Sequence, residues 1–496
     1  MGMLSQNRRE FLRSLGACAA ATFLPPMISE AGSGNRRHNV LLICVDDLRP
    51  QLGCFGHTEM VSPNIDRLAD EGRLFTRHYV QMAVCGPSRC SMLTSRRLAV
   101  WDCWKDLRRQ KTEPDRPVSM PHLFRRNGYR TVCIGKISHQ PGGVIGPEAK
   151  VHEVPFSWDL AYAPVGKWKT PWGAFFSYDK GRIREYGYGK NDRTMPAYEA
   201  ANVPDTGYAD GLNAEEAVKQ LRLLKDEQFF LAVGFYKPHL PFNAPKKYWD
   251  MYDPKKIELA NNPFPPTNVD PDISMHPSFE LTTHYGWPSG SGKVTEAEAR
   301  TLRHAYFACV SYVDAQIGKV LDELKQLGLD KNTVIALWSD HGWHLGEHGM
   351  WGKQTNFEIA ARSPLILKVP GMSEPGKRTR SLVETVDLYP TLAELCDLES
   401  PDDLAGTSLV PMVRDPSHGG KSFAYSFHPR GKLMGRTLRT DRYRVVHWTN
   451  KQGKTAQVEL YDHQTDPDEN KNIAARHPEL VERLLSKLSG LKQQSQ

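Results

Sequence analysis

Cys85, Pro87 and Arg89 form a C-x-P-x-R pattern at the start of a predicted helix, within the stretch VCGPSRCSMLTSRR from 84 to 97. Backbone N–H groups and the helix dipole favour negative charge at a helix N-terminus. Position 85 is therefore suited to an anionic nucleophile or an oxyanion. A buried cysteine before a turn is the ordinary alternative. The other reactive side chains of the chain decide between the two.

Four apolar runs read as buried parallel strands, and each is followed closely by acidic, basic or imidazole side chains. In open α/β sheets, ligands collect beyond the carboxyl ends of the strands, so we expect these side chains to meet at one sheet edge. The runs cover 39–45, 129–134, 228–235 and 333–338, and the residues that follow are Asp46, Asp47, Lys136, His139, Lys237, His239, Asp340 and His341.

Adjacent carboxylates at a strand end, Asp46 and Asp47, suit a hard cation such as Ca²⁺, although a turn or helix cap is the commoner use of a single Asp. A zinc site is not predicted, because the nine cysteines contain no C-x-x-C pair and Glu347-His348 is not part of an H-E-x-x-H motif. We expect the cysteines to be mainly reduced and buried.

The remaining pattern predicts an α/β fold. A mostly parallel sheet is sandwiched by helices over 36–431, and a small antiparallel sheet with one helix follows over 432–496. The irregular stretch from 140 to 213 is expected to supply substrate-binding loops, and a proline-rich stretch from 263 to 288 to cover the surface. The longest helix is predicted over 295–327.

The first 31 residues read as a twin-arginine-type signal peptide, with Arg8-Arg9 before an apolar run at 15–24. We therefore expect bacterial export by the twin-arginine machinery to the periplasm or beyond, with a lipoprotein site at Cys18 as the second choice. No transmembrane segment is predicted. The net charge of +7 comes from scattered basic residues, so a nucleic-acid partner is not expected.

Five motifs together resemble the formylglycine-dependent (type I) sulfatases of the alkaline phosphatase superfamily. They are N-V-x-x-I-x-x-D-D-L-R-P at 39–50, C-G-P-S-R at 85–89, G-K-I-S-H at 135–139, K-P-H-L-P-F at 237–242 and S-D-H-G-W-H-L-G-E-H-G at 339–349. The S-D-H-G motif is similar to that of the iduronate-2-sulfatase branch. The resemblance implies an alkaline-phosphatase-like fold and hydrolysis of sulfate esters.

The resemblance also implies a cofactor and a modified residue. Ca²⁺ would be held by Asp46, Asp47, residue 85, Asp340 and His341, and a maturation enzyme would convert Cys85 to formylglycine. The hydrated aldehyde attacks sulfur through one hydroxyl, and loss of the second proton expels sulfate as the aldehyde re-forms. The resemblance also implies that Arg89 and the metal stabilise the diolate, and that Lys136 and Lys353 neutralise charge on the sulfate oxygens. His139 would hydrogen-bond the formylglycine hydroxyl, and His239 would be the acid that protonates the leaving sugar oxygen.

The expected substrate is an acidic, sulfated sugar at a chain end. Tryptophan faces suit sugar C–H groups, and nearby cations suit a uronate carboxylate. The candidate substrate contacts are Trp343 and Lys237, with Trp101, Trp104, Trp158, Trp168 and Trp172 as further possible pocket walls. Two alternatives remain open: a phosphoric or phosphonic monoester hydrolase of the same superfamily, and a non-catalytic carbohydrate-binding homologue.

Overall fold

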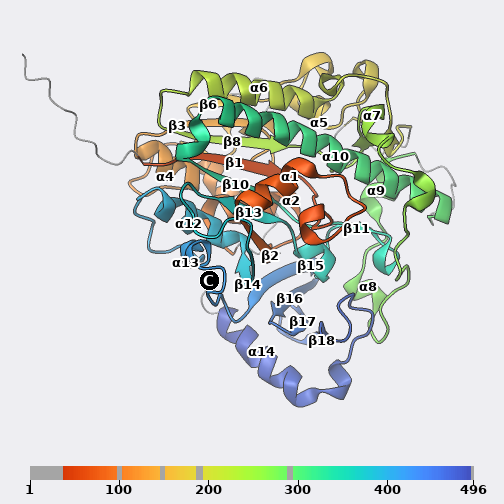
Figure 1. Ribbon diagram of the computed structural model, residues 1–496. Coiled ribbons are helices and arrows are strands. Elements are labelled where there is room, and N and C mark those ends of the chain that lie inside the picture. The colour runs from red at the N-terminus through yellow and green to blue at the C-terminus, as the bar shows by residue number, and fades with distance from the viewer. Residues whose placement is uncertain (1–36, 98–102, 146–150, 186–193, 287–293, 493–496) are drawn as a thin grey trace, which may run out of the picture. The chain divides into compact units, whose positions relative to one another are not determined.

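The predicted strand Asn39–Val45 is β1, and it lies in the middle of an eight-stranded sheet (Figure 1). In this computed structural model the described residues are 37–97, 103–145, 151–185, 194–286 and 294–492. The strand order is β14-β2-β13-β10-β1-β8-β3-β6. The strands are β2 (Arg73–Tyr79), β3 (Arg130–Gly135), β6 (Leu160–Tyr162), β8 (Phe229–Phe235), β10 (Thr333–Ser339), β13 (Leu365–Lys368) and β14 (Arg378–Glu384).

The sheet is mixed but mostly parallel, as expected. β1 runs parallel to both of its neighbours, β8 and β10, and β3 runs parallel to β8 and β6. Only β13 among these strands is antiparallel to its neighbours, β10 and β2. The carboxyl ends of β1, β3, β8 and β10 therefore meet at one edge, which is where the predicted reactive residues follow.

Helices cover both faces of the sheet because successive side chains of a strand point to opposite sides. On β1, Leu41, Ile43 and Val45 share a core with α1 (Pro63–Glu71), α6 (Ala209–Leu223) and α10 (Glu296–Gln326). Val40, Leu42 and Cys44 face α2 (Cys85–Thr94), α4 (Met120–Arg126) and α12 (Leu388–Leu395). Figure 1 shows α6 and α10 on one side of β1 and α4 and α12 on the other.

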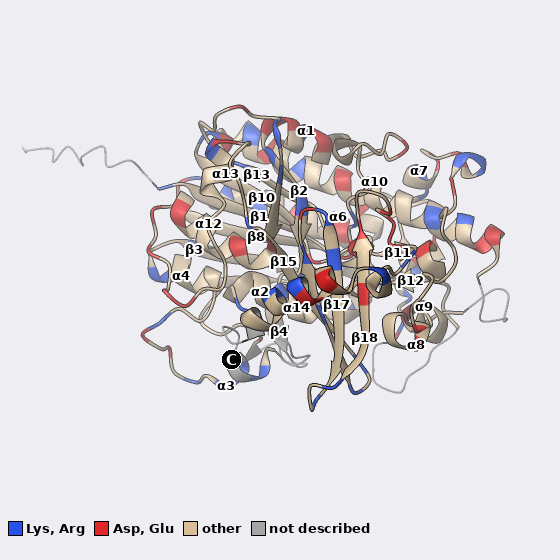
Figure 2. Ribbon diagram, turned by 90° about the horizontal axis from the view of Figure 1, so that it is seen from below, with Lys and Arg blue, Asp and Glu red and all other residues tan. Residues whose placement is uncertain are grey.

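A second sheet is antiparallel and contains the last strands of the chain. Its order is β15 (Ala424–Arg430), β16 (Leu433–Arg439), β17 (Tyr443–Asn450) and β18 (Thr455–Asp462). The amphipathic helix α14 (Pro478–Lys492) packs against β16 and β17 (Figure 2). The sequence predicted three of these strands; β15 begins before residue 432, so the division of the chain at that position stays a prediction.

Short elements fill the segments that looked irregular. They are β4 (Val144–Ile145), β5 (Val151–His152), α5 (Pro171–Phe175), β7 (Tyr198–Glu199), β9 (Phe242–Asn243), α7 (Lys246–Trp249), α8 (Pro271–Ser274), α9 (Phe279–His284), β11 (His344–Leu345), β12 (Trp351–Gly352), α11 (Glu358–Ala361), α3 (Lys105–Arg109) and α13 (Val410–Arg414). The sequence reading missed β6 and β14, which are short or rich in charged residues and so lack a continuous apolar run.

The predicted signal peptide at 1–31, Cys18 and Trp101 lie outside the described residues. The eight described cysteines are all free and buried. Within the described ranges, no helix has the length and apolarity needed to cross a membrane. Basic and acidic segments are interspersed along the ribbon (Figure 2).

Candidate active site

The backbone at the strand ends brings the acidic residues together. Asp47 follows β1 in the left-handed conformation (φ 60°), and its N–H donates to Asp340 Oδ1 at 3.0 Å. At the end of β3, Gly135 has φ 68°, and a Cβ there would lie 2.1 Å from the carbonyl oxygen of Gly234. Glycine is therefore required at that position for Lys136 to turn into the site.

Arg89 joins two of the three aspartates. Its Nη2 lies 3.0 Å from Asp46 Oδ1 and its Nε lies 2.9 Å from Asp340 Oδ2. Lys136 Nζ lies 2.6 Å from the other oxygen of Asp46. All four side chains are essentially inaccessible to solvent. α2 therefore supplies Arg89 as the positive centre of a buried charge cluster at the sheet edge.

Asp47 and Cys85 complete this cluster. Lys353 Nζ lies 3.1 and 3.0 Å from the two carboxylate oxygens of Asp47. Cys85 Sγ lies 3.8 Å from Asp47 Oδ1 and 3.4 Å from His341 Nε2. One ligand atom from each of Asp47, Cys85, Asp340 and His341 lies within 4.8 Å of the others, and the same holds for Asp46, Asp47, Cys85 and His239. The structure thus brings together the five residues expected to bind the metal.

The charges of this cluster set unusual pKa values. Burial, together with the neighbouring charge of Asp46, raises the pKa of Asp340 to about 6. Burial also raises the pKa of Asp47, despite the nearby basic side chains. Burial acts in the same direction on Asp46, but Lys136 and Arg89 outweigh it and hold its pKa well below the usual range. The carboxylates therefore favour an additional positive charge.

His341 presents a lone pair to the same carboxylates. Its Nδ1 lies 3.0 Å from the carbonyl oxygen of Gly342, which can only accept, so Nδ1 carries the proton. Burial lowers the pKa of His341 to about 4, so the ring is neutral and Nε2 is unprotonated. This nitrogen lies 3.4 Å from Asp47 Oδ1. A lone pair facing a carboxylate oxygen is stable when a cation lies between them, and this donor set fits Ca²⁺.

Cys85 is a poor nucleophile as a thiol. Burial raises its pKa well above the usual value, and the charge of Asp46 adds to this effect. Cys85 is the first residue of α2, and the charges of Lys136 and Lys353 favour its ionised form, but burial outweighs them. The expectation that the helix N-terminus stabilises an anionic nucleophile or an oxyanion at this position stays a prediction.

Two histidines stand at the sides of the cluster. His139 lies beside the backbone of the C-x-P-x-R pattern, since a Cβ on Gly86 would lie 3.7 Å from its Cγ. Burial and the charge of Lys136 lower the pKa of His139 to about 3. The ring of His139 is therefore neutral, and its Nδ1 atom has no hydrogen-bond partner among the described residues. His239 Nε2 lies 3.9 Å from Asp47 Oδ2.

Glu280 is a site residue that the sequence reading missed. Its Oε1 lies 3.1 Å from His239 Nε2, and its Oε2 lies 3.2 Å from Lys353 Nζ. Although burial opposes it, the charges of Lys353 and His239 hold the pKa of Glu280 well below its usual value. Glu280 lies on α9, within the proline-rich stretch that was expected only to cover the surface. No sequence motif signals it, because its partners come from distant segments.

The stretch from 140 to 213 contributes aromatic side chains that border the site, and its role in substrate binding stays a prediction. Phe175 packs its ring 4.4 Å from Lys136 Nζ and 4.8 Å from the His239 ring. Trp172 lies 5.7 Å from the His139 ring. Trp104 also borders the site, since a Cβ on Gly86 would lie 3.6 Å from its Nε1.

The other proposed substrate contacts lie away from open solvent. Trp158 and Trp168 are buried in the two cores of the sheet. Trp343 is 1% exposed and lies 5.0 Å from Lys353 Nζ. Lys237 Nζ donates to the carbonyl oxygens of His239 and Pro241 at 2.8 and 2.6 Å. In this arrangement Lys237 braces the loop that carries His239, and Trp343 supports Lys353; contact of either with substrate stays a prediction.

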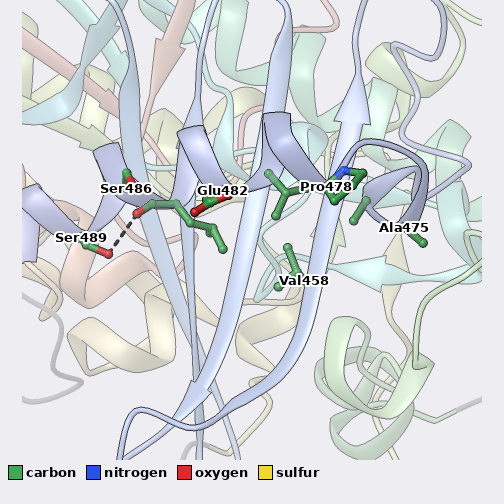
Figure 3. Close-up of a pocket in the computed structure, with 9 residues that line it drawn as sticks. Val458, Ala475, Pro478, Glu482, Ser486 and Ser489 are labelled. Carbon is green, nitrogen blue, oxygen red and sulfur yellow. Dashed lines mark hydrogen bonds between the residues drawn. The ribbon is translucent and has the colours of Figure 1, made fainter.

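A separate shallow groove lies between α14 and β18 (Figure 3). It is lined by Val458, Ala475, Pro478, Val481, Glu482 and Leu485 among others. Among the described residues of its lining, Glu482 is the only ionisable one, and none of them is a histidine, a cysteine or a basic residue. This groove therefore has no catalytic constellation, and the chemistry belongs to the strand-end cluster.

Comparisons with known proteins agree with this site. Residues 38–398 match the Sulfatase family model, and residues 346–494 match the model of the N-sulphoglucosamine sulphohydrolase C-terminal region. Iduronate 2-sulfatase of Mus musculus is 33% identical, over 85% of this chain and 86% of the relative. A sulfatase of Formosa agariphila is 31% identical, over 87% and 82% of the two chains.

A solved structure, the phosphonate monoester hydrolase of Silicibacter pomeroyi, matches with a TM-score of 0.73 at 22% identity, over 93% of this chain and 96% of the other. This likeness confirms the alkaline-phosphatase-like fold. With the family matches and the acidic cluster around Cys85, it leads to one conclusion: the chain belongs to the sulfatase family and is a sulfuric ester hydrolase.

Proposed function

We propose that this sulfatase removes sulfate from a sulfated, uronate-containing saccharide, using formylglycine at position 85 and Ca²⁺ held by Asp46, Asp47, Asp340 and His341. The observation that carries the proposal is the convergence of these four ligands on Cys85, with ligand atoms within 4.8 Å in two overlapping groups. The relatedness to iduronate 2-sulfatase supports the uronate substrate class.

When present, the hydrated formylglycine supplies a nucleophilic hydroxyl and Ca²⁺ supplies a clamp for sulfate oxygens. The chain's own residues organise the rest. Arg89 fixes the carboxylates of Asp46 and Asp340 through two short contacts. Lys136 and Lys353 place positive charge around position 85, and both act to lower the pKa of that side chain against burial. Their ammonium groups offset the negative charge that builds on sulfate oxygens.

His239 is the proposed acid for the leaving sugar oxygen. Its Nδ1 lies 2.7 Å from the carbonyl oxygen of Leu240, and its Nε2 lies 3.1 Å from Glu280 Oε1. Both ring nitrogens thus face acceptors, and the doubly protonated ring satisfies both. The leaving oxygen would take the Nε2 proton, and the neutral ring would remain hydrogen bonded to Leu240.

Export by the twin-arginine machinery to the periplasm or beyond, and modification of Cys85 by a formylglycine-generating enzyme, are part of the same proposal. The N-terminal arginine pair supports export, and the C-G-P-S-R motif at 85–89 supports the modification. Folding before export suits a site that is assembled from segments spread over the whole chain.

The test combines mass spectrometry with turnover. In protein from its native host, we expect the peptide that contains residue 85 to carry formylglycine, and we expect sulfate release from a nitrophenyl sulfate ester to exceed phosphate release from the matching phosphate ester. Cys85→Ala serves as the inactive control. An unmodified thiol throughout would contradict the mechanism, and faster phosphate release would favour a phosphoric or phosphonic monoester hydrolase. Saccharide binding without release of either group would favour the non-catalytic homologue.

A further inference from the structure

Arg184 is a buried cation that forms no ion pair with any residue in the described part of the chain. The residue is 7% exposed, its Nε atom has no hydrogen-bond partner, and no described residue forms an ion pair with its guanidinium. Arg89 and Arg444 are also buried, and each of them contacts two carboxylates. Burying a charge is costly unless it is paired, so Arg184 differs from these two arginines in having no carboxylate partner among the described residues.

The surroundings of Arg184 hold its guanidinium in place through aromatic rings. Its Cζ lies 3.8 Å from the ring centre of Phe176 and 5.2 Å from that of Tyr285. Its backbone N–H donates to the Phe176 carbonyl oxygen at 3.1 Å. Stacking on aromatic faces stabilises a guanidinium. The N–H donors point outward in the plane of the guanidinium itself, so stacking does not use them. The side chain is thus oriented in advance for an acceptor.

Further polar atoms with unused hydrogen-bonding capacity lie on the adjoining segment. The buried hydroxyl of Tyr285 faces the Arg184 guanidinium, and the Nδ1 atom of His284 is buried and has no hydrogen-bond partner among the described residues. Both residues belong to the end of α9, the helix that carries Glu280 into the active site. Both atoms can donate a hydrogen bond, so together with Arg184 they would match a group with several acceptor oxygens.

Phe176, which packs against Phe175 and Trp172, lies between Arg184 and the catalytic cluster. The Phe176 ring centre lies 3.8 Å from Arg184 Cζ and 6.3 Å from the ring centre of His239, so the guanidinium and this imidazole are at most about 10 Å apart. This separation is on the order of one sugar residue. A single sugar residue is therefore long enough to reach from His239 to Arg184.

We propose that Arg184 forms a subsite for a second anionic group of the substrate, a carboxylate or a sulfate carried by the sugar whose ester is cleaved or by its neighbour. The proposal rests on the proposed sulfatase function and narrows its substrate class. Both anions are planar or tetrahedral groups of oxygens that a guanidinium binds through paired N–H donors. Glu280 lies beside His239, and its negative charge would repel a second anion there. The second anion would therefore lie on the Arg184 side of Phe176.

The test compares three sulfate esters in wild type, Arg184→Gln and Arg184→Lys: a 2-O-sulfated uronate disaccharide, the same disaccharide with its carboxyl group reduced, and a disulfated neutral disaccharide. We expect Arg184→Gln to lower kcat/KM for a substrate with the second anion by roughly 10- to 100-fold relative to the carboxyl-reduced substrate, mainly through KM. If kcat/KM falls only for the uronate disaccharide, Arg184 binds a carboxylate. If it falls only for the disulfated disaccharide, Arg184 binds a second sulfate. Arg184→Lys should lose less.

Arg182→Gln is the matched control, because Arg182 is exposed and already paired with Glu199. Calorimetric binding of an unsulfated uronate disaccharide and of a sulfated one is measured on the same proteins, with thermal unfolding as a check on folding. If wild type releases no sulfate from any ester, the proposed function fails, and the binding measurement still tests the subsite. Equal substrate preference and equal binding in wild type and in the folded Arg184 variants would overturn the inference.

Discussion

Glu280 Oε1 lies 3.1 Å from His239 Nε2, while the other oxygen of Glu280 lies 3.2 Å from Lys353 Nζ. One carboxylate thus holds the proposed acid and one of the sulfate-facing cations at once. It acts through these two partners, so we regard Glu280 as a positioning residue.

We expect Glu280→Gln to slow hydrolysis of an alkyl or sugar sulfate by about tenfold or more, because the amide holds the protonated His239 ring less well. A nitrophenyl sulfate should be affected less, since its leaving group needs no proton. Steady-state rates with both esters check this. Glu258→Gln, at an exposed position, is the control. An equal loss on both esters would indicate a general disturbance of the site instead.

Asp46→Asn and Asp340→Asn should each lower the calcium content of the purified protein, because the site depends on its net negative charge to hold a divalent cation. Elemental analysis after dialysis measures this directly. Asp402→Asn is the control, since Asp402 is exposed and away from the cluster. Full calcium content in both cluster variants would show that these carboxylates are not ligands.

Cys85→Ser and Cys85→Ala should abolish sulfate release while leaving the thermal unfolding temperature close to that of wild type. Neither side chain forms a geminal diol, and both are small enough for a position that is 4% exposed. Sulfate release by ion chromatography and unfolding by circular dichroism are the two measurements. Turnover near the wild-type rate in either variant would refute the hydrate mechanism.

His78 should make stability depend on pH in mildly acidic solution. The ring is buried on β2 beside Ser363 and Thr385, and burial lowers its pKa from 6.5 to about 4. Its neutral form therefore stabilises the fold fully above pH 6.5, and this contribution is lost as the pH falls toward about 4.

The expected loss from this one group is on the order of 3 kcal/mol. Urea unfolding of wild type and His78→Gln between neutral pH and about pH 4 checks it. The free-energy difference between the two proteins should shrink on acidification. A difference that stays constant over this range would mean that the pKa of His78 is the same in the folded and unfolded states.

The reactive groups of the active site were predictable from local patterns. A continuous apolar run predicts a buried strand, and parallel strands place their carboxyl ends at one edge, so Asp46, Lys136, His239 and Asp340 were expected to meet. The C-x-P-x-R pattern likewise placed Cys85 and Arg89 on one helix. These inferences need only the pattern of apolar residues along the sequence and the rule that parallel strands end at the same edge of a sheet.

The tertiary structure alone decided the groups that contact this core from irregular segments. Glu280, Phe175 and Arg184 lie in stretches without a hydrophobic period, and each meets its partners across a long separation in sequence. It also showed that Lys237 binds carbonyl oxygens of its own loop. The physical reason is that strand ends are positioned by backbone hydrogen bonding, which sequence periodicity reports, whereas loop side chains are positioned by packing and charge between distant segments, which it does not.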